Sequence, residues 1–167
     1  MVVMIFGVLK ENAKDGVTLK YEELTKYAVV MDYADQEKER LKNDYNNMIQ
    51  AEELMDGGRR FKELKAVASD SVKLAETATP EELEVFTKIE TANNENISAF
   101  KEAYTGKIKD KEQLGAGLYN RITKALRADA DLKERYTAIL ETVKSERLAA
   151  AEGSEGAEET EGEESPQ

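Results

Sequence analysis

The stretch Glu22-Glu23-Leu24-Thr25-Lys26-Tyr27 decides the fold, because a matching stretch, Glu81-Glu82-Leu83-Glu84-Val85-Phe86, follows it 59 residues later. In both copies the apolar positions fall at steps of three and four, which is the spacing of a single apolar stripe along a helix. The sequence therefore predicts two long helices that form a duplicated or pseudo-symmetric pair. Two further positions recur at the same offset: Leu41 with Phe100, and Tyr45 with Tyr104.

The first long helix is expected over about residues 21–55, where a coiled-coil heptad stripe is interrupted only by Lys38 and Glu52. Gly57-Gly58 should end this helix, because paired glycines readily adopt the left-handed conformation of a helix cap. A shorter helix with one apolar face is expected next, over about residues 60–76.

The second long helix has the clearest start signal in the chain, Thr79-Pro80-Glu81-Glu82. This pattern is typical of a capping box with proline in the first helical position. We expect the helix to continue to about residue 105, where Gly106 ends it.

Two more helices are expected, over about residues 111–128 and 131–150, and a cap at Asp131 with Glu134 begins the last one. Five helices with short connections predict an all-α protein, an elongated helical bundle over residues 21–150.

The two ends of the chain differ from the predicted bundle. Residues 1–20 are expected to form a hydrophobic arm or hairpin, in which Val17-Thr18-Leu19-Lys20 could pair back across an Asp-Gly turn. The apolar residues 1–9 have three alternative readings: a packed arm or short strand, the remnant of an export signal, or a membrane-touching anchor. Residues 151–167 contain seven acidic residues and no basic one, which predicts a disordered acidic tail.

Composition excludes several classes of function. The chain has no Cys and no His, which rules out disulfides, zinc fingers and thiol or Ser-His catalysis. Of its 35 acidic residues seven lie in the tail, so the rest carries 28 acidic against 24 basic residues. We expect no enzyme activity, no cofactor, no metal site, no transmembrane segment and no nucleic-acid partner.

A polar layer is the first candidate site. Lys38 on the first long helix, and Glu90 and Asn93 on the second, occupy positions of the heptad stripe that are normally apolar. If the two helices pack antiparallel, these side chains could form a ligand or ion site inside the bundle. The alternatives are a layer that only fixes helix register, or charged ends that reach solvent.

A local excess of positive charge is the second candidate site. Residues 107–127 carry six basic residues against Asp110 and Glu112, inside an otherwise acidic chain. They could form a docking face for an acidic partner or for the acidic tail, and the alternative is an ordinary solvated helix face. The basic residues are Lys107, Lys109, Lys111, Arg121, Lys124 and Arg127.

Tyr119-Asn120-Arg121-Ile122, followed by the cap-like Asp129-Ala130-Asp131-Leu132, resembles a family of uncharacterised exported bacterial helical domains. That family also has a Glu-Leu-x-x-Phe/Tyr helix. The resemblance implies a location beyond the inner membrane and brings no activity with it. The helix element is matched twice here, by Glu23-Leu24 with Tyr27 and by Glu82-Leu83 with Phe86.

The expected function is that of a non-enzymatic structural or protein-binding component. It would belong to the periplasm or cell envelope if an upstream export signal is missing, and otherwise to the cytoplasm. Tyr33, Met48 and Tyr119 are candidate anchors for a protein partner, which could be a second copy of the chain. One rival is a chaperone or assembly factor that uses the acidic tail for solubility. A more distant rival is an enzyme with carboxylate chemistry in the polar layer.

Overall fold

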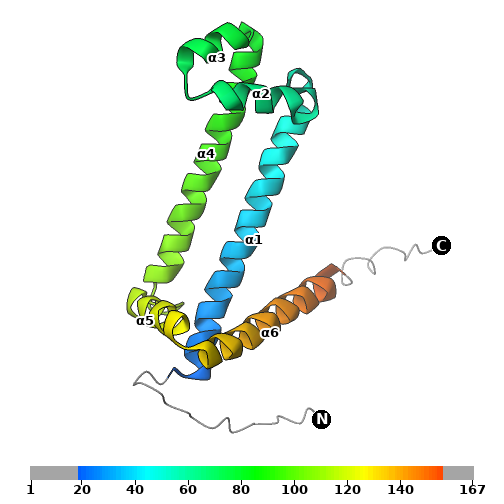
Figure 1. The fold of residues 1–167 in the computed structure, drawn as a ribbon. Helices are drawn as coiled ribbons and strands as arrows, with labels where there is room; N and C mark the ends of the chain where they lie inside the picture. Colours follow the sequence, from blue (N-terminus) through cyan, green and yellow to red (C-terminus); the bar gives the residue numbers. More distant parts are fainter. Residues whose placement is uncertain (1–18, 156–167) are drawn as a thin grey trace, which may run out of the picture. The chain divides into compact units, whose positions relative to one another are not determined.

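The computed structural model describes the backbone of residues 19–155 and the side chains of residues 19–151. This part of the chain is helical and contains no strand, so the all-α prediction is confirmed. The predicted N-terminal arm, apart from Leu19 and Lys20, and the tail beyond residue 155 lie outside the described residues. The elements are α1 (Tyr21–Ala51), the 3-10 helix η1 (Glu53–Gly58), α2 (Arg59–Val67), α3 (Ser71–Thr77), α4 (Pro80–Lys109), α5 (Ala116–Ala128) and α6 (Ala130–Glu155) (Figure 1).

The described residues belong to two compact units. Unit 1 contains the start of α1, up to Val29, together with α5 and α6 from Leu114 onward. Unit 2 is Val30–Gln113, which includes the rest of α1, η1, α2, α3 and α4. The division falls inside α1 and inside the range predicted as one bundle, so a single helix supplies residues to both units.

The chain reverses after α1 through three residues in the left-handed region. Asp56, Gly57 and Gly58 have φ values of 47°, 58° and 95°. Glycine adopts this region without the steric cost that a Cβ brings. The predicted Gly57-Gly58 turn is confirmed, but α1 itself ends at Ala51, because the chain tightens there into η1.

The prediction of a single helix over residues 60–76 is wrong, because the chain forms two helices there, α2 and α3, with a break between them. Asp70 causes the break. Its backbone is extended, and its Oδ1 accepts hydrogen bonds from the N–H groups of Val72 and Lys73. An aspartate at an N-cap stabilises a new helix start more than it would a helix interior.

The start of α4 follows the prediction, since Thr79 and Glu82 form the full capping box with Pro80 behind the cap. The predicted end at Gly106 is wrong, because α4 continues to Lys109. A Cβ added at Gly106 would meet nothing within 4 Å, so this glycine lies in an open position of a regular helix. The helix ends instead at Asp110, whose carboxylate accepts the Glu112 N–H at 2.9 Å.

The last two helices differ from the prediction at their boundaries. α5 begins at Ala116, after Gly115 with φ 83°, and not at residue 111. The cap of α6 is Asp129, whose Oδ1 accepts the Leu132 N–H at 3.0 Å, and not Asp131, which lies in the first turn. Because α6 runs to Glu155, the first five residues predicted as tail are helical.

Each unit has its own buried apolar residues. In unit 2 the core lies where η1, α2 and α4 meet, and its buried members are Ile49, Met55, Phe61, Leu64, Phe86 and Ile89. In unit 1 the buried residues include Leu24, Tyr27, Ala28, Leu114, Ile122, Leu132 and Ile139. None of the described helices is both long enough and apolar enough to cross a bilayer.

Candidate functional site

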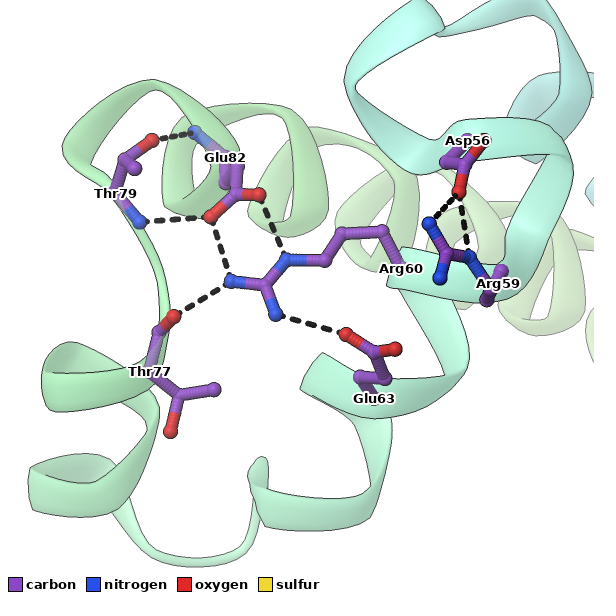
Figure 2. A network of polar contacts seen from close by, with 7 residues as sticks. All are labelled: Asp56, Arg59, Arg60, Glu63, Thr77, Thr79 and Glu82. Carbon is purple, nitrogen blue, oxygen red and sulfur yellow. Dashed lines mark hydrogen bonds and ion pairs between the residues drawn. The ribbon is translucent and has the colours of Figure 1, made fainter.

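The densest polar network in unit 2 centres on Arg60 of α2 (Figure 2). Its Nε and one terminal nitrogen donate to the two carboxylate oxygens of Glu82, at 2.7 and 2.8 Å. The guanidinium also donates to Glu63 at 2.9 Å and to the Thr77 carbonyl at 2.6 Å. Arg60 therefore ties α2 to the residues that end α3 and begin α4.

Glu82 is held from two sides, because the Thr79 N–H also donates to its Oε2 at 2.8 Å. The Arg60 guanidinium, helped by the Thr79 N–H, lowers the pKa of Glu82 from 4.5 to about 2. A carboxylate that stays ionised and has both oxygens occupied is a poor proton donor or acceptor near neutral pH. We therefore interpret this network as structural.

Unit 1 repeats this arrangement around Glu23, the residue equivalent to Glu82. Glu23 Oε2 accepts the Lys20 N–H at 2.9 Å, while its Oε1 pairs with Arg121 of α5. The aromatic residue four positions later is buried in both units, as Tyr27 in unit 1 and as Phe86 in unit 2. The sequence repeat therefore corresponds to one local arrangement in both units: a glutamate at a helix start that pairs with an arginine, next to a buried aromatic ring.

The buried rings pack against aromatic residues of the helix that supplies the arginine. Tyr27 lies 5.7 Å from Tyr119 of α5, between ring centroids, and 5.4 Å from Tyr136 of α6. Phe86 lies 5.0 Å from Phe61 of α2. Tyr119, predicted as a partner anchor, thus belongs to the aromatic packing of unit 1.

Glu90 is the centre of a second polar cluster in unit 2. Its two oxygens accept from the Tyr45 hydroxyl of α1 and from the Lys65 ammonium of α2. Burial, and then the neighbouring Glu90 carboxylate, raise the pKa of the Tyr45 phenol. Tyr45 therefore stays protonated and donates, which makes this cluster a fixed link between α1, α2 and α4.

The structure does not bring the three predicted polar-layer residues together. The pairs Tyr45–Glu90 and Met31–Tyr104 show that α1 and α4 run antiparallel (Figure 1), in a register that sets Lys38 opposite Ile97. The Lys38 side chain is exposed and pairs with Asp35 at 3.5 Å. Asn93, the third member, is half-buried one turn after Glu90.

The six basic residues of 107–127 are divided between the two units. In unit 2, Lys107 donates to Gln113 at 3.3 Å and lies 4.5 Å above the Tyr33 ring, and this contact uses another predicted anchor. In unit 1, Arg121 is paired with Glu23. A common docking face for all six residues stays a prediction. Their exposed members are Lys109, Lys111, Arg121, Lys124 and Arg127.

The third predicted anchor, Met48, is half-buried and packs against the core of unit 2.

The described residues contain no group of three side chains that could hold a metal ion. The sequence did not predict the ion pairs Arg60–Glu82 and Arg121–Glu23, because no local pattern indicates which distant arginine will pair with a glutamate at a helix start.

One surface of α4 is built differently from these clusters. Phe86 and Ile89 are buried at its beginning, whereas Ile97 and Phe100 in its second half are only half-buried. Beside these apolar residues, α4 carries a row of uncharged residues that are spaced by four, four and three positions. We call it the α4 face: Ala92, Asn96, Phe100 and Ala103.

The α4 face lies in a part of the chain that is poor in charge. Between Thr91 and Phe100 the only charged residue is Glu95, although 35% of the whole chain is charged. On the α4 face itself, Asn96 and Phe100 are half-buried and Ala103 is exposed. Depletion of charge around a partly exposed aromatic ring is typical of the centre of a protein interface.

No protein-family model matches the chain, and neither a curated protein nor a solved structure shows detectable similarity to it.

Proposed function

We propose that the chain is a non-enzymatic helical component that acts by binding protein through the α4 face. The observation that carries this proposal is the half-burial of Asn96 and Phe100 on the α4 face, in contrast to Phe86 and Ile89, which are buried at the beginning of the same helix. Half-buried apolar side chains at helical spacing lose their remaining contact with water when another helix packs over them.

The chemistry of the polar clusters supports a non-enzymatic role. Glu82 and Glu90 are two carboxylates of unit 2 that are each held by a cation and a second donor. Carboxylates with these partners link helices within unit 2. The cell-envelope location rests on the sequence resemblance alone and stays a prediction.

Site-specific photo-cross-linking in cells tests the proposal. A photoreactive residue replacing Asn96 reports on the α4 face, and one replacing Ser98 reports on the opposite side of the same helix, because the two positions differ by about 200° around the axis. We expect one protein, identified by mass spectrometry, to be captured from position 96 and from Ala103 but not from Ser98. Equal capture from positions 96 and 98, or capture from neither, would contradict the proposal.

A further inference from the structure

The left-handed turn after α1 contains the dipeptide Asp56-Gly57, and the chain has one other Asp-Gly dipeptide, Asp15-Gly16. Asp-Gly rearranges readily without an enzyme, because glycine has no side chain that hinders attack by its own nitrogen. We propose that Asp56-Gly57 is a site of spontaneous isoaspartate formation that the folded turn shields, so that the modification marks chains in which this turn has opened. This inference goes beyond the proposed function and does not depend on it.

The rearrangement takes place in two steps. First, the Gly57 nitrogen attacks Cγ of the Asp56 carboxyl group. A C–N bond forms, the carboxyl hydroxyl and the amide hydrogen leave as water, and a five-membered succinimide ring results. Water then opens the ring: attack at Cγ restores aspartate, whereas attack at the former backbone carbonyl leaves the chain running through Cγ, with a free α-carboxylate. The atoms balance, and the only other reactant is water.

The backbone conformation of Asp56 opposes closure of this ring. The ring requires Cβ of Asp56 and the nitrogen of Gly57 to lie on the same side of the Cα–C bond. With φ 47° and ψ 56°, these two atoms of an L-residue lie on nearly opposite sides of that bond. Among the described residues, Asp56 is the only one other than glycine with a positive φ. A conformation of this kind persists where the surrounding structure imposes it.

Arg59 holds both groups of Asp56 that would have to move. Its backbone N–H donates to the carbonyl oxygens of Asp56 and Met55, which fixes the orientation of the peptide group between Asp56 and Gly57. Its side-chain Nε donates to Oδ2 of Asp56 at 2.6 Å, which holds the carboxylate (Figure 2). Ring closure therefore requires that both the backbone and the side-chain bonds from Arg59 break.

The residues on either side keep the turn closed. Met55 is fully buried, and its N–H donates to the Glu52 carbonyl at 2.9 Å. Gly58 is buried too, with its Cβ position 3.4 Å from Cγ2 of Ile49. The Asp56 side chain itself is 54% exposed, so water reaches it and the shielding comes from conformation. The reaction therefore waits for local opening of the turn.

The test compares isoaspartate formation in the folded and the denatured full-length chain at 37 °C and pH 7. Tryptic peptides that contain Asp56 are separated into aspartate and isoaspartate forms and quantified by mass spectrometry over several weeks. We expect the folded chain to react at least about tenfold more slowly at Asp56 than the chain in concentrated guanidinium chloride. In the denatured chain Asp15-Gly16 is the internal standard and should react at the same rate as Asp56-Gly57.

Two alanine variants form a matched pair. Gly58→Ala strains the closed turn and should raise the rate at Asp56 in the folded chain about tenfold. Gly106→Ala changes an open position within α4 and should not raise it. Asp56→Asn keeps the test valid if Gly58→Ala fails to fold, because asparagine tolerates the left-handed region and closes the same ring with loss of ammonia. Its deamidation should also be about tenfold slower in the folded than in the denatured chain.

Equal rates at Asp56 in the folded and the denatured wild-type chain would overturn the inference. An unchanged rate in a folded Gly58→Ala variant, with helix content confirmed by circular dichroism, would overturn it as well, because opening of this turn would then not limit the reaction. Absence of isoaspartate at Asp56 from the denatured chain would contradict the assignment of the site. The photo-cross-linking result for the α4 face is independent of all these outcomes.

Discussion

Glu82 has two structural roles. It completes the capping box of α4 through Thr79 and receives the bidentate guanidinium of Arg60 from α2. Charge-assisted bidentate pairs are the stronger kind of hydrogen bond. Because both partners engage the ionised carboxylate, Glu82 makes the stability of unit 2 depend on pH.

The direction of this dependence follows from the lowered pKa of Glu82. Its carboxyl has a pKa of about 2 in the folded protein against an ordinary value of 4.5. A carboxyl whose pKa is lower in the folded than in the unfolded protein stabilises the native state fully at pH values above its ordinary pKa. This contribution to the free energy of unfolding is lost as the pH falls from about 4.5 towards 2. We expect Glu82→Gln to be less stable than wild type at pH 6, with a difference that narrows below pH 4.5.

Urea denaturation at a series of pH values measures this difference. Arg59→Ala is the matched control, because Arg59 is the neighbouring arginine, its side chain is 79% exposed, and it pairs with Asp56, three residues earlier in the chain. We expect this control to leave the denaturation midpoint unchanged. A gap between Glu82→Gln and wild type that stays constant from pH 6 to pH 2.5 would contradict the assignment.

Thr79 offers a second test of the same helix start. Its hydroxyl accepts the Glu82 N–H at 3.2 Å, so Thr79→Ala leaves that donor without its cap. We expect a loss of about 1 kcal/mol in the free energy of unfolding. Thr87→Ala, an exposed position in the interior of the same helix, is the control and should change the free energy by less than about 0.5 kcal/mol. Equal effects at both positions would mean that the capping box does not stabilise α4.

Two glycines of unit 2, Gly58 and Gly106, have opposite surroundings. Gly58 has φ 95°, and an added Cβ would lie 3.4 Å from Ile49 Cγ2. Gly106 lies within α4 and has open space around the Cβ position. Gly58→Ala should therefore destabilise the protein by about 1–2 kcal/mol, whereas Gly106→Ala should stabilise it by about 0.5–1 kcal/mol.

The denaturant midpoints of Gly58→Ala and Gly106→Ala at pH 7, compared with wild type, show whether each variant is destabilised or stabilised. Gly57→Ala is an informative intermediate, because Gly57 has φ 58° but no atom within 4 Å of its Cβ position. It should cost backbone strain alone, and so destabilise less than Gly58→Ala. Destabilisation by Gly106→Ala would show that this position is not regular helix.

The sequence predicted the helix starts best where the signal is local. Thr79-Pro80-Glu81-Glu82 contains all the groups of its capping box, so the start of α4 could be placed to the residue. The break at Asp70 was missed although its signal is also local, because the apolar spacing of residues 60–76 continues through it. Apolar periodicity reports which face is buried and does not report where the backbone leaves the helix.

The candidate sites were harder to predict, because their partners are distant in the sequence. Lys38 and Glu90 both lie on heptad positions, but the register of antiparallel helices is set by contacts such as Tyr45–Glu90 that no local pattern specifies. The Arg60–Glu82 and Arg121–Glu23 clamps were missed for the same reason. Sequence showed which residues could be polar members of the interior and left their partners undetermined.

The whole described chain combines two copies of one device with one shared helix. Each unit has a glutamate at a helix start clamped by an arginine, and a buried ring packed on the arginine's helix. α1 supplies the clamped start in unit 1 and the Tyr45 contact in unit 2. Each unit nevertheless has a fully buried apolar residue of its own, Ile122 in unit 1 and Leu64 in unit 2.

Separate cores predict that the units lose structure separately. Ile122 and Leu64 are both fully buried, and truncation of either to alanine should cost about 2–5 kcal/mol within its own unit. By hydrogen exchange with mass spectrometry, Ile122→Ala should raise exchange in α5 and α6 and leave α2 and α3 protected, whereas Leu64→Ala should do the reverse. Val72→Ala, at a side chain with 65% exposure, is the control and should change neither. If either core variant raises exchange uniformly over all six α-helices, α1 transmits the loss of one core to the other, and the two units unfold as one.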